Sequence, residues 1–358
     1  MRQKLPDFPW DALAPYGAIA RTFPEGAIDL SVGTPVDPTP EFIQSAFREA
    51  ANSPSYPVTV GTPELRAAIT TWAKKTLGVT GDFGVLPVIG SKEFVAWLPT
   101  FIEAQSVLYP DVAYPTYLVG ALLAEAAATA VNLDAAQWPV ADMAWVNSPS
   151  NPTGRVHSES EYRSAIAWSR KTKSVLVSDE CYLEFGDSVQ PTSILHYTDG
   201  DNSNILGVYS LSKRSSMAGY RAAFIVGDPQ LIAKILEVRK HAGMMVPLPV
   251  QKAMVAALAD VTHVAEQRAR YNARRATLVP ALVAAGFTIE NSEAGLYIWA
   301  TRNENCWDSV AWLADLGIIA TPGIFYGELG SRHIRIAMTA TDIQITHAAR
   351  RIHAKVGA

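Results

Sequence analysis

Cysteine is scarce in this chain, with only Cys181 and Cys306 among 358 residues. Two cysteines cannot build a disulfide framework or a cysteine-rich zinc site. No apolar stretch approaches the length of about 18 residues that a membrane-spanning helix needs. The formal net charge is −4, so the excess of basic residues typical of nucleic-acid binding is missing. We therefore expect no metal centre, no membrane span and no nucleic-acid partner.

Other familiar signals are missing as well. The segment 1–7 has no apolar signal region, and we expect a cytoplasmic protein. The seven histidines show no recognisable metal-ligand spacing. No Gly-x-Gly-x-x-Gly follows an apolar run, which argues against a nicotinamide-dependent dehydrogenase.

Short apolar runs alternate with helical patterns through the first two thirds of the chain. Seven runs are apolar at nearly every position, which is typical of strands covered on both faces: 85–89, 106–109, 128–133, 143–146, 174–178, 205–211 and 222–226. A capping box at 158–161 opens one of the intervening helices. This alternation predicts an α/β fold, with a mainly parallel seven-stranded sheet flanked by helices.

The pattern changes after residue 245. A long helix is expected over 261–285, followed by a strand at 295–299, a helix at 307–316, a strand at 333–337 and a final helix. These elements predict a smaller α+β domain. The proline-rich stretch 245–249 is the expected junction between the domains.

Polar and ionisable side chains follow five of the predicted strands. In open α/β sheets, ligands bind beyond the carboxyl ends of the strands. The groups found there are Ser91 and Lys92, Tyr114, Asn151, Asp179 with Tyr182, and Ser212 with Lys213. We expect these groups to converge on one site.

Lys213 has the most informative setting. It follows an apolar run, has Ser210 and Ser212 beside it, and precedes Arg221 by eight residues. This combination suits a lysine that holds a phosphorylated cofactor covalently. Ser91 and Lys92, at an expected helix start, offer a phosphate backbone N–H groups, a hydroxyl and a cation.

Each of these residues also has a plainer interpretation. The segment 90–92 can be an ordinary strand–helix turn, and 151–154 has the composition of a tight turn. A buried Asp179 needs a partner, which is either a protonated heterocyclic nitrogen or a helix that it caps. Arg221 can form a structural salt bridge. Tyr114 and Tyr182 can be core aromatics.

Four motifs together resemble one enzyme family. Asn151-Pro152-Thr153-Gly154, Asp179-Glu180-Cys181-Tyr182, Ser210-Leu211-Ser212-Lys213 with Arg221, and Arg335 within 333–336 occur in family order. The chain resembles fold-type I, pyridoxal-phosphate-dependent aminotransferases of class I/II over essentially its whole length. The resemblance implies the aspartate-aminotransferase-like fold, with a large cofactor-binding domain of residues 41–245. The small domain would come from both termini, 1–40 and 246–358.

The resemblance also implies roles for twelve residues, pyridoxal 5′-phosphate as cofactor, amino acids and keto acids as substrates, and a homodimer. Lys213 would bind the cofactor and move the proton, Asp179 would bind the pyridine nitrogen, Tyr182 and Asn151 would bind the ring hydroxyl oxygen, and Tyr114 would stack on the ring. The phosphate would lie among Ser91, Lys92, Ser210 and Arg221, with Tyr56 reaching it from the partner subunit. Arg335 would bind the substrate α-carboxylate, with Gly33 and Asn151 beside it.

The chemistry explains these residue types. A free lysine has a pKa of about 10.4, and a partly desolvated pocket would lower it so that a neutral amine attacks. Asp179 would keep the ring nitrogen protonated, which the electron sink requires. Arg335 offers a carboxylate a planar, bidentate fork that a lysine lacks.

The stretches 5–11 and 28–38 look like actinobacterial N-succinyldiaminopimelate aminotransferases. That likeness implies transamination between glutamate and N-succinyl-2-amino-6-oxopimelate, in lysine and diaminopimelate biosynthesis. Lys92, Arg21, Arg155 and Arg332 are the cations considered for the acidic arm of this substrate. The alternatives are an aspartate or aromatic aminotransferase, a β-lyase, and a non-catalytic, cofactor-binding regulator, which the negative charge disfavours.

Overall fold

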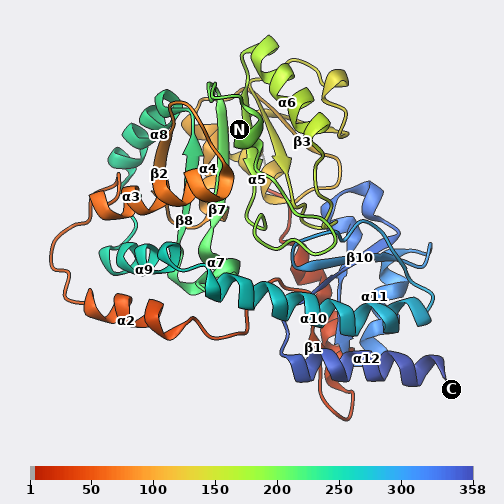
Figure 1. Ribbon diagram of the computed structural model, residues 1–358. Coiled ribbons are helices and arrows are strands. Elements are labelled where there is room, and N and C mark those ends of the chain that lie inside the picture. The colour runs from red at the N-terminus through yellow and green to blue at the C-terminus, as the bar shows by residue number, and fades with distance from the viewer. Residues whose placement is uncertain (1–4, 358) are drawn as a thin grey trace.

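A seven-stranded sheet forms the centre of the larger part of the molecule (Figure 1). The computed structural model describes residues 5–357. In spatial order the strands are β2 (Gly84–Val88), β8 (Ala223–Gly227), β7 (Ile205–Ser210), β6 (Val175–Asp179), β5 (Met143–Asn147), β3 (Ser106–Pro110) and β4 (Ala127–Val131). Strand β8 runs antiparallel to both neighbours, and all other pairs are parallel. The predicted α/β class and mainly parallel sheet are confirmed.

The seven predicted strands match the observed ones to within two residues, with one instructive difference. The run 205–211 was expected to be a strand throughout, but β7 ends at Ser210. Leu211 instead opens a one-turn helix, α7 (Leu211–Arg214). The side chain of Ser210 accepts a hydrogen bond from the backbone N–H of Ser212, which caps this turn. Lys213 therefore lies on a short helix rather than in a loop.

Helices cover both faces of the sheet. Residues of α4 (Ser91–Phe101), α5 (Thr116–Leu123) and α8 (Pro229–Ala242) pack against one face, and residues of α3 (Pro63–Trp72), α6 (Glu159–Thr172) and α9 (Leu248–Ala259) against the other. Successive strand residues point to opposite faces: Val208 faces the first group and Tyr209 the second. This two-sided burial explains why the strands are apolar at nearly every position.

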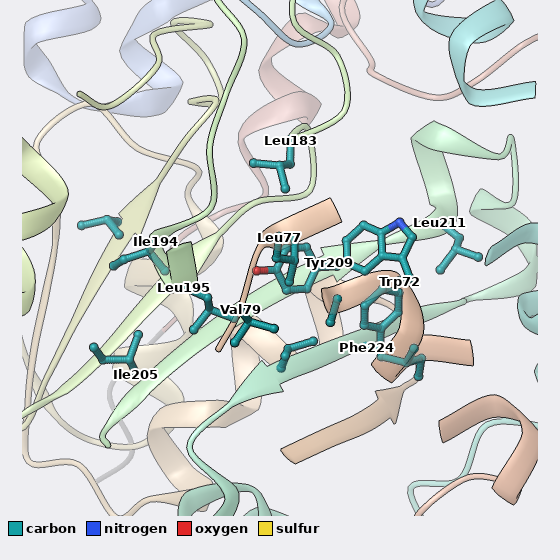
Figure 2. Packing of buried hydrophobic residues seen from close by; sticks show 14 of the residues in the cluster. Trp72, Leu77, Val79, Leu183, Ile194, Leu195, Ile205, Tyr209, Leu211 and Phe224 are labelled. Atoms are coloured by element: carbon teal, nitrogen blue, oxygen red, sulfur yellow. The ribbon is translucent and has the colours of Figure 1, made fainter. Parts of the chain in front are cut away.

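An aromatic cluster fixes α3 to β7 and β8 (Figure 2). The ring of Trp72 meets the rings of Tyr209 and Phe224 edge-on, each with a centroid distance of 5.2 Å. Tyr209 and Phe224 stack on each other at 5.5 Å. Truncating a buried aromatic side chain of this size to alanine costs about 3–5 kcal/mol. The cluster therefore holds in place the strand whose end carries Lys213.

The smaller domain contains two sheets. Strands β12 (Thr321–Pro322), β13 (His333–Ala337), β10 (Tyr297–Thr301) and β9 (Thr288–Ile289) form an antiparallel sheet in that order. Strand β1 (Ile28–Asp29) pairs in parallel with β11 (Ile318–Ile319). Helices α1 (Ala14–Arg21), α11 (Cys306–Asp315) and α12 (Asp342–Val356) accompany the sheets. Because β1 comes from the amino-terminal part of the chain and pairs with β11, we propose that both ends build this domain.

The chain passes between the two domains along α10 (Thr262–Ala284), which spans both in Figure 1. The sequence predicted a boundary at 245/246, beside the prolines of 245–249. However, α9 follows those prolines and packs against α2 (Glu41–Glu49) and α3 on the large domain. We therefore propose that the crossing lies at α10, some residues later than the sequence suggested.

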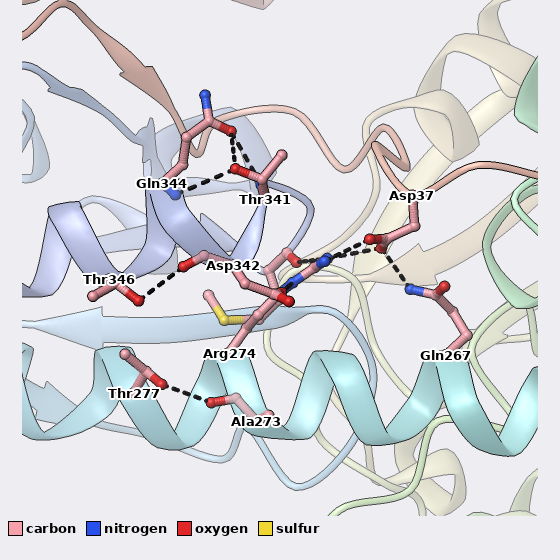
Figure 3. A network of polar contacts seen from close by, with 10 residues as sticks. Asp37, Gln267, Ala273, Arg274, Thr277, Thr341, Asp342, Gln344 and Thr346 are labelled. Carbon is pink, nitrogen blue, oxygen red and sulfur yellow. Dashed lines mark hydrogen bonds and ion pairs between the residues drawn. The ribbon is translucent and has the colours of Figure 1, made fainter.

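A buried polar network ties α10 to the segment that precedes α2 (Figure 3). Arg274 donates to both carboxylate oxygens of Asp37, at 2.6 and 2.9 Å, and to Asp342 at 2.6 Å. Gln267 donates to Asp37 at 2.8 Å. Burial alone would raise the pKa of Asp37, but the bonds from Arg274 and Gln267 hold it below its ordinary value. The network thus joins chain segments more than 200 residues apart.

No helix between residues 5 and 357 combines the length and the apolar character needed to cross a membrane. The longest helix, α10, has 23 residues and carries charged side chains such as Arg274 and Arg275. Over the same described range, no cluster of three or more His, Cys, Asp and Glu side chains has a metal-binding arrangement.

Candidate active site

A cavity of about 750 Å³ opens at the carboxyl ends of β5, β6 and β7. Eleven of the twelve residues predicted from the sequence line it: Gly33, Ser91, Lys92, Tyr114, Asn151, Asp179, Tyr182, Ser210, Lys213, Arg221 and Arg335. The twelfth, Tyr56, lies outside the cavity with 92% of its surface exposed. One chain thus brings together every predicted residue except the one that was assigned to a partner subunit.

Asp179 ends β6 and is 6% exposed. Its carboxylate accepts hydrogen bonds from the Tyr117 hydroxyl at 3.0 Å and from the backbone N–H of Cys181 at 3.2 Å. No cation of residues 5–357 forms an ion pair with it, and burial raises its pKa. No helix begins directly after β6, so Asp179 is not a helix cap. A protonated ring nitrogen would give this carboxylate the charged partner it lacks.

Lys213 lies on α7 and lines the cavity. Its pKa is lowered to about 8, mainly by burial; the positive charges of Arg335 and Arg221 also lower it, and Cys181 opposes the shift. A lysine with this pKa is partly neutral near physiological pH and can act as a nucleophile or a base. The Lys213 amine is therefore already desolvated in the protein without a bound ligand.

Two sets of contacts anchor the turn that carries Lys213. Arg214, the next residue, forms an ion pair with Glu184 at 2.5 Å and donates to the Ala257 carbonyl at 3.1 Å. The Ser215 hydroxyl lies 2.9 Å from Nε2 of His263, whose Nδ1 lies 2.6 Å from Asp260. A four-residue helix does not hold its own shape in water. These contacts therefore fix the direction of Lys213.

Arg221 lies against the start of α4. A Cβ atom placed on Gly90 would lie 2.2 Å from Nη2 of Arg221, so only glycine leaves room for the guanidinium. Arg221 donates to the Ala218 carbonyl at 2.8 Å and pairs with no carboxylate of the described residues. With Ser91 at the first position of α4 and the Ser210 hydroxyl nearby in the cavity lining, this corner suits a phosphate.

Arg335 is 3% exposed in the middle of β13. It donates to Oδ1 of Asn151 at 2.8 Å and to the Ser31 carbonyl at 2.6 Å. Its Nε is buried without a hydrogen-bond partner, and no carboxylate within residues 5–357 pairs with it. A buried guanidinium with unused donors is a strong site for a carboxylate.

The structure adds cavity residues that the sequence analysis missed. Tyr117 binds Asp179, Tyr297 contacts Tyr182, and the amino-terminal segment contributes Phe8 and Trp10 to the cavity wall. Tyr117, on α5, lies three residues after Tyr114, which precedes that helix. This closeness in sequence was the one available signal.

The two-domain fold and the cavity define a protein with the aspartate-aminotransferase-like fold. A solved Thermus thermophilus structure, described as a probable N-succinyldiaminopimelate aminotransferase, has the same fold with a TM-score of 0.88 and 25% identity, covering 97% of this chain and all of that one. The family model for aminotransferase class I and II matches residues 25–352. The chain belongs to this family, whose members depend on pyridoxal phosphate.

Several relatives are similar over most of their length. A protein of Mycobacterium tuberculosis described as a probable aminotransferase is 51% identical, covering 97% of this chain and 85% of that protein. The 4-dedimethylamino-4-oxo-anhydrotetracycline transaminase OxyQ of Streptomyces rimosus is 50% identical, covering 98% and 99%. An LL-diaminopimelate aminotransferase of Dehalococcoides mccartyi is 32% identical, covering 96% and 95%.

The lowered pKa of Lys213 can be measured in the cofactor-free protein. We expect the rate of Lys213 acylation by a small amine-reactive reagent to rise with pH around a midpoint near 8. The exposed Lys240 is the internal control for the reagent. Peptide mapping by mass spectrometry gives both rates in one experiment. A Lys213 midpoint near the ordinary lysine value of about 10.4 would contradict the desolvated site.

Proposed function

We propose that this protein transfers an amino group between glutamate or 2-oxoglutarate and N-succinyl-2-amino-6-oxopimelate or N-succinyl-LL-diaminopimelate, in lysine and diaminopimelate biosynthesis. The observation that carries this proposal is that two cationic side chains, Arg335 and Lys92, line the same cavity. Neither has a carboxylate partner among residues 5–357, and each substrate has an α-carboxylate and at least one more distant carboxylate. The diaminopimelate-related names of two similar proteins support the same substrate class.

The proposed cofactor contacts are those that the family resemblance implies, made by residues that line the cavity. Asp179 would bind the pyridine nitrogen, Tyr182 and Asn151 the ring hydroxyl oxygen, and Tyr114 would stack on the ring. Ser91, Ser210 and Arg221 would hold the phosphate at the start of α4. Bound pyridoxal phosphate supplies an electron sink for the carbanion at the substrate α-carbon. Nζ of Lys213 would hold the cofactor and then take and return the α-proton, while Arg335, with Gly33 and Asn151 beside it, would fix the α-carboxylate.

The sequence analysis considered Lys92 both for the phosphate and for the acidic arm of the substrate. Its Nζ lies 5.7 Å from the centre of the Phe8 ring, on the amino-terminal wall of the cavity. We therefore propose that its ammonium group binds the distal carboxylate of the substrate. The other cations considered lie elsewhere: Arg155 pairs with Glu161, Arg332 donates to Asn303, and Arg21 ends α1 outside the cavity lining.

A second substrate class is favoured by a specific observation. Apolar side chains of Phe8, Trp10, Val32, Ala96 and Val119 form much of the cavity wall. Such a wall suits a flat, polycyclic ketone as well as the methylene arm of an acid. The similarity to OxyQ makes an aromatic ketone the alternative substrate.

A substrate panel tests these proposals. The cofactor-loaded enzyme is given N-succinyl-LL-diaminopimelate, LL-diaminopimelate, aspartate and phenylalanine as donors with 2-oxoglutarate, and cystathionine in a pyruvate-release assay. We expect kcat/KM for the succinylated donor to exceed the values for aspartate and phenylalanine by about 10- to 100-fold, because one added charged hydrogen bond contributes about 1.5–3 kcal/mol. Preference for aspartate or phenylalanine, or rapid pyruvate release, would overturn the proposed substrate.

We also propose a homodimer in which Tyr56 reaches the cavity of the partner subunit. The segment between α2 and α3 exposes Tyr56 and Val58, at 92% and 52% of their surfaces. Large exposed side chains of this kind mark contact surfaces when they lie together.

Mixed dimers test this arrangement. Lys213→Ala and Tyr56→Ala proteins should each have little activity, but a mixture that exchanges subunits should recover part of it. Each mixed dimer contains one site with both native residues. A monomer in sedimentation, or a mixture that exchanges subunits without recovering activity, would contradict the proposal.

A further inference from the structure

Tyr297 lies between two groups that the proposed function uses. It is the first residue of β10, is 3% exposed and lines the cavity. Its hydroxyl lies 3.1 Å from the hydroxyl of Tyr182. The Cζ atom of Arg335 lies 4.0 Å from the centre of its ring. One side chain therefore contacts the residue proposed for the cofactor ring oxygen and the residue proposed for the substrate carboxylate.

The register of the small-domain sheet fixes this position. Strand β10 pairs with β13 so that Tyr297 is opposite Ala337 and Trp299 is opposite Arg335. Tyr297 and Arg335 are thus diagonal neighbours on one face of the sheet, a relation within reach of long side chains. The guanidinium rests on the ring face, so the ring takes up none of its N–H donors, and Nε has no hydrogen-bond partner within residues 5–357.

The Tyr297 hydroxyl occupies space that a side chain at position 33 would fill. A Cβ atom on Gly33 would lie only 2.1 Å from the hydroxyl oxygen of Tyr297. The absence of a side chain at Gly33 therefore makes room for this oxygen. It fills a gap between the backbone of Gly33 and the hydroxyl of Tyr182.

We propose that Tyr297 is a positioning residue that couples carboxylate binding at Arg335 to the hydrogen bond that Tyr182 donates. The proposal rests on the roles suggested above for Arg335 and Tyr182. The ring of Tyr297 supports the guanidinium, and its hydroxyl donates to the oxygen of Tyr182. The proton of Tyr182 then points toward the cofactor ring oxygen, and donation from Tyr297 makes it a stronger donor, because hydrogen bonds in a chain polarise one another.

Tyr297→Phe removes the oxygen and keeps the ring. The weakened Tyr182 bond should stabilise negative charge on the cofactor ring oxygen less well, so the titration midpoint of the bound cofactor's visible absorbance should rise. Loss of one hydrogen bond corresponds to about 0.5–1 pH unit. We expect kcat to fall by about fivefold or more, while KM for the amino donor changes less than about twofold because the guanidinium keeps its ring support.

Tyr271→Phe is the matched control. Tyr271 lies on α10, is fully buried, and its hydroxyl has no hydrogen-bond partner within the described range 5–357. Both variants therefore lose one buried phenolic oxygen, but Tyr271 lies outside the cavity lining. The absorbance midpoint should shift in Tyr297→Phe and stay at the wild-type value in Tyr271→Phe.

Three results would decide against the coupling. A Tyr297→Phe midpoint equal to the wild-type value, with unchanged kinetics, would remove Tyr297 from the network. A rise in KM alone, with an unchanged midpoint, would make it part of the carboxylate site only. An equal shift in both variants would indicate a general effect of lost buried hydroxyls. The midpoint needs no substrate, so it stays informative even if the wild-type enzyme rejects the succinylated donor and the proposed function fails.

Discussion

One constraint shapes the structure: three ionisable groups are buried around one cavity, and no oppositely charged side chain of residues 5–357 pairs with any of them. Asp179 is bound by a hydroxyl and an amide, Lys213 has a pKa lowered to about 8, and Arg335 keeps a buried Nε without a partner. Removing an ion from water costs several kcal/mol even after the protein relaxes. The fold places these groups at the end of β6, just after β7 and in the middle of β13. A ligand that is cationic at its ring nitrogen, reactive toward an amine and linked to a carboxylate would satisfy all three groups.

The rest of the molecule holds these groups in register. Trp72 packs α3 against β7, and the contacts of Arg214 and Ser215 fix the short turn that follows that strand. Arg335 comes from the other domain, so its distance from Lys213 depends on how the domains are joined. The Arg274–Asp37 ion pair ties α10, along which the chain passes between the domains, to the segment that precedes α2. The site is therefore a product of both domains, which is why its parts are far apart in the sequence.

Local patterns were enough to predict the strands and the polar groups that follow them, whereas Gly33 and Arg335 came from the family resemblance. Ionisable residues directly after apolar runs, such as Asp179 and Lys213, are visible in one sequence because strand ends meet at one sheet edge. Tyr297 and Tyr117 were missed because an aromatic residue in an apolar strand or helix has the same sequence pattern as a core residue. Its polar partner is visible only from tertiary contacts. The direction of the Lys92 side chain depends on its rotamer, which a sequence pattern does not predict.

The central claim is that Asp179 gives the cofactor ring nitrogen a buried anionic partner. Nitrogen-15 NMR of the enzyme loaded with ring-labelled pyridoxal phosphate tests it directly, with Asp179→Ala for comparison. The ring nitrogen should stay protonated to above pH 8 in the wild type and lose its proton in the variant, because an opposite charge at close range favours the protonated form. A protonated ring nitrogen in both proteins at pH 8 would contradict the account.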